Sequence, residues 1–109
     1  MQIIDAGEFK PGADGSADYV EQLRVPALSF GTYSIPAGRP DRQSPHAEDE
    51  IYVVVRGRGS FTAGGRTVEG VGPGTALFVP AGEEHRFQDV SEDLTTLVFF
   101  APAFTGTRR

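Results

Sequence analysis

The sequence predicts an all-β domain, folded as a closed barrel or sandwich of short strands. Runs of apolar, β-branched and aromatic residues alternate with turn residues from Leu28 onward, which is typical of strands. The 109 residues include 14 glycines and 8 prolines, so the chain turns often. No internal repeat or heptad pattern is present. Many short strands with frequent corners suit a barrel, because closure removes exposed strand edges.

The length admits a single domain, which we expect to span residues 1–109. Residues 28–101 are predicted to form the barrel core. Residues 1–25 are polar without strict alternation, and we expect an N-terminal extension with little regular structure, at most a helical turn near 17–23. The short polar tail, residues 105–109, is expected to be mobile.

Seven strands are predicted, each a run of strand-forming residues bounded by turn residues. They are 28–35, 50–56, 59–63, 66–71, 75–80, 85–90 and 94–101. Gly64 and Gly65 separate two of these runs and can both take positive φ, which predicts a tight hairpin. Segments 36–38, 72–74 and 80–82 combine proline with glycine and are expected to form corners.

Charge and composition exclude several classes of function. The 15 acidic residues outnumber the 10 basic ones, for a net charge of -5, so no basic patch for nucleic acid is expected. The absence of cysteine excludes disulfides, thiolate metal sites and a cysteine nucleophile. The longest apolar run, 97–101, is far below the roughly 18 residues of a membrane span, and no signal peptide is evident. We expect a cytoplasmic protein with neither nucleic acid nor membrane as partner.

The strand aromatics are expected to fill the interior or a dimer contact. A domain this small buries only about 60 to 70% of its unfolded surface, so oligomerisation is expected. Tyr52 and Phe87 share strand parity with Glu50 and His85, which makes them the candidate walls of a small-molecule pocket. The aromatic residues at strand positions are Phe30, Tyr33, Tyr52, Phe61, Phe78, Phe87, Phe99 and Phe100.

Both histidines lie close to acidic residues, which allows two interpretations: metal ligands, or solvated ion pairs. On an extended strand Ser44, His46, Glu48, Glu50 and Tyr52 would share one face. A straight strand places the Cα atoms of residues 46 and 50 roughly 13 Å apart. If both bind one ion, segment 47–49 must bulge or curl.

Taken together, the spacings resemble the two-motif signature of the cupin superfamily, in particular its small single-domain members. The matching positions are Gly38, His46, Glu50, Gly57, Gly74, Pro80, Gly82 and His85. The resemblance implies a jelly-roll β-barrel that holds a divalent metal inside through His, His, Glu and His. Because such barrels are often dimeric, the resemblance also implies a homodimer. Ser44 stands at the first histidine position, and Asp89 replaces the terminal asparagine of the second motif.

The ligands that this resemblance leaves are His46, Glu50 and His85. Two imidazoles and one carboxylate suit Fe(II), and the same set could hold Mn, Ni or Zn. Glu48 has the parity to be a fourth ligand or an acid/base group, or belongs with Asp49 to a solvated acidic turn. Alternatively, the histidines are hydrogen-bonded inside a metal-free, ligand-binding barrel.

Two functions of different class follow. The first is a metal-dependent enzyme acting on a small organic molecule, which the resemblance implies to be of dioxygenase, isomerase or decarboxylase type. The second is a non-catalytic cupin that binds or senses a small molecule. The sequence assigns no catalytic residue, and it lacks the G-x-S-x-G motif of a serine hydrolase.

Overall fold

The structure is a computed structural model that describes residues 1–41 and 45–106. These residues form six strands in one antiparallel sheet and no helix, which confirms the predicted all-β class. Accordingly, no helix among them is long and apolar enough to cross a membrane. The strands are β1 (Asp18–Val25), β2 (Leu28–Ile35), β3 (Asp49–Ala63), β4 (Arg66–Val71), β5 (Ala76–Val79) and β6 (His85–Ala101).

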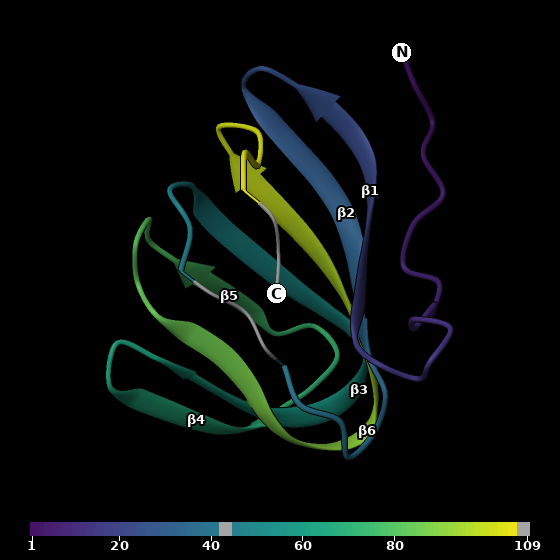
Figure 1. Ribbon diagram of the computed structural model, residues 1–109, viewed down its shortest axis with the longest axis vertical. Helices are drawn as coiled ribbons and strands as arrows, with labels where there is room; N and C mark the ends of the chain where they lie inside the picture. The colour runs from purple at the N-terminus through teal and green to yellow at the C-terminus, as the bar shows by residue number, and fades with distance from the viewer. Residues whose placement is uncertain (42–44, 107–109) are drawn as a thin grey trace.

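The two longest strands, β3 and β6, pair along almost their whole length. Asp49 pairs with Ala101 at one end, and Ala63 pairs with His85 at the other. The C-terminal half of β6 also pairs with β2, which pairs with β1, whereas the C-terminal half of β3 pairs with β4. In Figure 1 the long strands bend as they pass from the layer of β1 and β2 to the layer of β4. Both layers of the barrel therefore share these two strands.

A bulged region around Gly57 makes this bend possible. The β3–β6 register shifts three times between Val54 and Ser60, and Gly57 has a φ of 91°. A Cβ at this position would lie 2.1 Å from the carbonyl oxygen of Asp93 on β6. Only glycine permits both this backbone conformation and so close an approach.

Two predicted strand breaks are wrong for this reason. Segments 50–56 and 59–63 belong to one strand, β3, and segments 85–90 and 94–101 belong to β6. Turn residues between them mark bulges, since the partner strand bends alongside and the ladder continues. The hairpin at Gly64 and Gly65 is confirmed, with φ values of 57° and 76°.

The N-terminal extension is shorter than predicted, because β1 occupies residues 18–25 where little regular structure was expected. No helical turn forms near 17–23. β1 is an edge strand without a fully buried residue, so its sequence lacks the alternation that marks a half-buried strand. Residues 1–17 contain neither helix nor strand. They run beside the sheet (Figure 1), where the Gly7 amide donates to Thr32 Oγ1 at 3.0 Å.

The tail also differs from expectation at its start. Thr105 was predicted to lie in a mobile tail, but its amide and hydroxyl both donate to the Glu48 carboxylate. Residues 107–109 lie outside the described part of the chain. The segment Ala103–Thr105, called here the C-terminal segment, is thereby attached to the loop that precedes β3.

The core fills the space between the two layers, and most of the predicted aromatics contribute to it. Its buried members are Tyr33, Ile35, Tyr52, Val54, Phe61, Val71, Val79, Phe87, Val90, Leu94, Val98, Phe100 and Phe104.

The other three strand aromatics face outward and form a row across four strands with Ile51. Phe30 on β2 is opposite Phe99 on β6, Phe99 is opposite Ile51 on β3, and Ile51 is opposite Phe78 on β5. Phe30 and Phe99 stack with ring centroids 4.7 Å apart, and Phe78 is 63% exposed. We call these four residues the outer apolar row.

The Gly57 bend can be tested against a matched glycine. Gly57→Ala should destabilise the protein strongly, because it combines positive φ with a backbone clash. Gly38 has a similar φ of 78°, but a Cβ there meets nothing within 4 Å. Gly38→Ala should therefore cost only about 1 to 2 kcal/mol for the left-handed conformation. Urea unfolding measures both, and equal losses would contradict a steric requirement at Gly57.

Candidate metal centre

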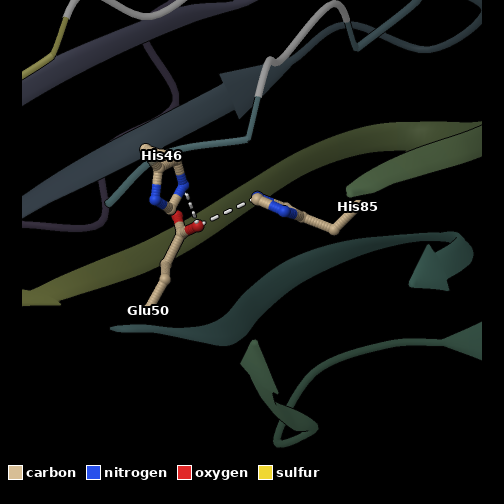
Figure 2. A group of neighbouring side chains, drawn as sticks. All are labelled: His46, Glu50 and His85. Carbon is tan, nitrogen blue, oxygen red and sulfur yellow. Dashed lines mark hydrogen bonds and ion pairs between the residues drawn. The ribbon is translucent and has the colours of Figure 1, made fainter. Parts of the chain in front are cut away.

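Three side chains predicted as metal ligands converge inside the barrel (Figure 2). His46 comes from the loop before β3, Glu50 from β3, and His85 from the first position of β6. Glu50 Oε1 lies 2.8 Å from His46 Nε2 and 3.0 Å from His85 Nε2. One ligand atom from each residue lies within 4.8 Å of the others, which is close enough to share one ion.

A bend in the chain brings the first two residues together. β3 begins only at Asp49, and Ala47 and Glu48 form a bend, so segment 47–49 departs from a straight strand as a shared site requires. The Gly82 amide donates to the His46 carbonyl at 2.8 Å, and the Ala81 amide donates to Asp49 Oδ1 at 2.9 Å. These bonds tie the His46 loop to the corner that leads into His85.

The ligand side chains are almost sealed from solvent. The side chain of His46 is 8% exposed, and those of Glu50 and His85 are 0% exposed. The His46 ring meets Phe100 and Phe104 edge-on, with centroids 4.9 and 5.7 Å away. The interpretation of these residues as solvated ion pairs is therefore wrong.

The hydrogen bonding of His85 suits a metal ligand. Its Nδ1 lies 2.8 Å from the Glu83 carbonyl oxygen, which can only accept, so Nδ1 carries a proton and donates. In the neutral ring Nε2 then presents a lone pair to Glu50 Oε1, 3.0 Å away, whereas in the protonated ring it donates to that oxygen. Two acceptors that face each other need a proton or a cation between them. The donor set therefore fits a divalent ion.

The pKa of His85 reflects this environment. Burial by itself lowers the pKa, because it disfavours the charged ring. The hydrogen bond to Glu50, the Glu83 carbonyl and the charges of Glu50 and Asp41 together outweigh burial and raise the pKa above its ordinary value of 6.5. The carboxylates thus favour positive charge at this position.

Glu48 is buried beside the three converging residues and is not part of the solvated turn that one interpretation proposed. It is 2% exposed, and its Oε2 accepts from the Thr105 amide at 3.1 Å and hydroxyl at 2.5 Å. The group of converging ligand atoms does not include it. Its neighbour Asp49 is exposed but anchors the Ala81 amide. Ser44, at the first histidine position of the motif, lies outside the described residues.

The two candidate pocket walls are both buried. Tyr52 is 0% exposed, and its ring centroid lies 5.9 Å from that of His85. Phe87 packs edge-on against Tyr52, with ring centroids 5.1 Å apart. Their role as walls stays a prediction. A cavity of about 500 Å³ beside His85 is lined by Pro45, Thr62, Gly64, Gly65, Glu84, His85 and Arg86.

Three further residues around the centre were not predicted from the sequence. Asp41 is buried and accepts from the Tyr33 hydroxyl at 2.6 Å and the Phe87 amide at 2.9 Å, so its carboxylate joins β2 to β6. Phe104 and Thr105 approach from the C-terminal segment. No strand periodicity marks these positions. The only available signal was an aromatic residue just beyond the last strand.

Comparison with known proteins identifies a matching protein family, a related protein and several solved structures of similar fold. The family model described as "Cupin domain" matches residues 31–100. An uncharacterized protein of Streptomyces coelicolor is 43% identical over 99 residues, which cover 91% of this chain and 92% of that protein.

Solved structures are similar in fold at low sequence identity. An RmlC-like cupin protein from Desulfovibrio desulfuricans superposes with a TM-score of 0.79 and 20% identity, over 95% of this chain and 99% of that one. The DMSP lyase DddQ from Ruegeria pomeroyi gives a TM-score of 0.78 and 21% identity, over 93% of this chain and 55% of that one.

The raised pKa of His85 predicts a pH-dependent stability of the metal-free protein. The folded state binds this proton more tightly than the unfolded chain, so the stabilisation is complete below the ordinary pKa and disappears as the pH rises through the folded pKa. His85→Gln should therefore lose more unfolding free energy at about pH 5.5 than at about pH 9. Urea unfolding with a chelator measures this difference. Phe87→Leu, a change of an uncharged side chain on the same strand, should lose a similar unfolding free energy at the two pH values. The same pH dependence of the loss in both variants would contradict the raised pKa of His85.

Proposed function

The chain belongs to the cupin domain family, and from this premise we propose that it is a metal-dependent cupin acting on a small organic molecule. His46, Glu50 and His85 would hold one divalent ion. Two imidazoles and a carboxylate with open positions suit Fe(II), and Mn, Ni or Zn are also compatible. The reaction would be of the dioxygenase, isomerase or decarboxylase type.

One observation carries the proposal: Glu50 Oε1 and both histidine Nε2 atoms converge in a buried place. The Glu83 carbonyl fixes the tautomer of His85 so that its lone pair points inward. An ion held by three protein ligands keeps positions for water or substrate oxygen, and when bound it supplies Lewis acidity or oxygen activation.

The residues of the chain would contribute orientation and exclusion of water. Phe100 and Phe104 hold the plane of the His46 ring, and Tyr52 packs beside His85. Low exposure keeps bulk water away from the ligands and strengthens their electrostatic interaction with bound charge. The cavity that His85 lines, without His46 or Glu50, offers space for a small molecule beside one of the three proposed ligands.

A metal-free binding cupin is the second candidate. The observation in its favour is that Glu50 Oε1 lies within hydrogen-bond distance of both rings, so a proton could hold the cluster together without an ion. In that case the barrel would bind or sense a small molecule without turnover. Metal content separates the two candidates.

We expect protein purified without a His tag or chelator to contain close to one Fe, Mn, Ni or Zn ion per chain. His46→Ala and His85→Ala should each abolish binding, because either change removes an inward-facing nitrogen. Elemental analysis and titration calorimetry measure both expectations.

A third ligand variant, Glu50→Gln, has a matched control in Glu69→Gln, which makes the same change at an exposed carboxylate on β4. Only Glu50→Gln should lower metal content. Less than about a tenth of an ion per wild-type chain after reconstitution near neutral pH, where imidazole is mostly unprotonated, would favour the metal-free binding protein.

We also propose that the protein is a homodimer whose two copies cover the outer apolar row. Phe30, Phe99, Ile51 and Phe78 lie in register across four strands. The last three are exposed, and Phe30 is half-buried beside Phe99. Adjacent exposed apolar residues are typical of protein interaction sites. A sheet face can meet its own copy about a two-fold axis, since the same patch then serves both chains.

Phe78→Asp should convert this dimer to a monomer, because it would bury a charge in the contact. Val68→Asp on β4 is the control, since Val68 is also exposed, at 37%, but lies outside the row. Size-exclusion chromatography with light scattering gives the mass of each. A wild-type monomer, or a dimer that survives Phe78→Asp but not Val68→Asp, would contradict this interface.

A further inference from the structure

Glu48 and His46 each have one buried polar atom without a hydrogen-bond partner among the described residues, and these two atoms face each other. They are Glu48 Oε1 and His46 Nδ1, and they lie 3.8 Å apart. Both side chains are nearly buried, at 2% and 8% exposure. A buried donor or acceptor without a partner is unfavourable, so a small approach that joins the pair satisfies both atoms.

His85, in the same centre, already has the hydrogen-bonding arrangement that we infer for His46. Its Nδ1–H donates to the Glu83 carbonyl, and its Nε2 faces Glu50. His46 has the same arrangement, because its Nε2 faces Glu50 Oε1 at 2.8 Å while its Nδ1 points to Glu48. A histidine that ligates a metal commonly donates its other ring N–H to a carboxylate or a carbonyl, which fixes the ring and increases the basicity of the ligand nitrogen.

The carboxylate of Glu48 is itself held from the far side. Both the amide and the hydroxyl of Thr105 donate to its Oε2, which leaves Oε1 directed at His46. The C-terminal segment that carries Thr105 is anchored in turn, because the Phe104 amide donates to Ser29 Oγ at 2.9 Å. The Glu48 carboxylate is thus held through Oε2 by a segment that is itself anchored to β2.

We propose that Glu48 is the positioning residue of His46: its Oε1 accepts the Nδ1–H, so that the Nε2 lone pair is directed at the metal position. This role rests on the proposed metal site. It assigns Glu48 to the ring of His46 and not to the ion, which separates it from a fourth ligand. It also makes the C-terminal segment a support of the centre, through Thr105.

Glu48→Gln tests the role without changing the size of the side chain. The two Thr105 donors hold the amide oxygen on their side, so the amide NH₂ group faces His46 Nδ1–H as donor against donor. Zn²⁺ affinity should fall roughly 10- to 100-fold, which is the usual effect of losing such a partner. The matched control is Glu69→Gln, which makes the same change at an exposed carboxylate on β4 and should leave Zn²⁺ affinity unchanged.

A spectroscopic measurement separates positioning from a general structural effect. In the Zn²⁺-loaded wild type, the Nδ1–H proton of His46 should give a low-field, slowly exchanging signal in ¹⁵N-resolved NMR. Glu48→Gln should shift that signal upfield or remove it, whereas the control Glu69→Gln should retain it. If Glu48→Gln does not fold, the wild-type signal alone decides, because a fast-exchanging or absent Nδ1–H signal overturns the role.

The outcomes distinguish this inference from the function on which it rests. A wild type that binds no Zn²⁺, Fe²⁺, Mn²⁺ or Ni²⁺ overturns the metal site and this role with it. A wild type that binds, together with a Glu48→Gln variant of equal affinity and unchanged His46 signal, overturns the role of Glu48 alone. Loss of all binding in Glu48→Gln, with the Nδ1–H signal of wild type absent, identifies Glu48 as a direct ligand and likewise overturns positioning.

Discussion

The antiparallel pairing of β3 with β6 is the interaction on which the rest of the structure depends. It runs from the Asp49–Ala101 pair to the Ala63–His85 pair and passes through the bend at Gly57. Because the same two strands belong to both layers, this bend determines how the layers face each other. It also places Glu50 near one end of the ladder and His85 near the other, both directed into the interior.

The centre concentrates negative charge in the interior, and each carboxylate is stabilised by a specific set of donors. Asp41 accepts from a tyrosine hydroxyl and a backbone amide, Glu48 from Thr105, and Glu50 lies against both imidazoles. An ionised carboxylate without such partners costs several kcal/mol to bury. Three buried carboxylates beside two histidines favour positive charge here, and a proton and the proposed metal ion would compete for the same atoms.

Much of the fold could be predicted because strand formation is local. The limits of β2 and β4 and the Gly64–Gly65 hairpin follow from runs of strand-forming residues between turn residues. The edge strand β1 could not be predicted in this way, since no residue in it is fully buried and alternation is absent. The continuity of β3 through Gly57 was also missed, because a bulge and a turn use the same residues.

By itself, the sequence determined most strand-forming runs, the turns between them, and the two motifs that contain His46, Glu50 and His85. Each of these features is a local pattern or a fixed spacing along the chain. It left open whether Glu48 faced solvent or the site. Tertiary structure decided this through Thr105, 57 residues farther along the chain, whose amide and hydroxyl bond the carboxylate. It likewise decided which aromatics are buried and which form the outer apolar row. Such contacts join residues distant in sequence, and no local pattern encodes them.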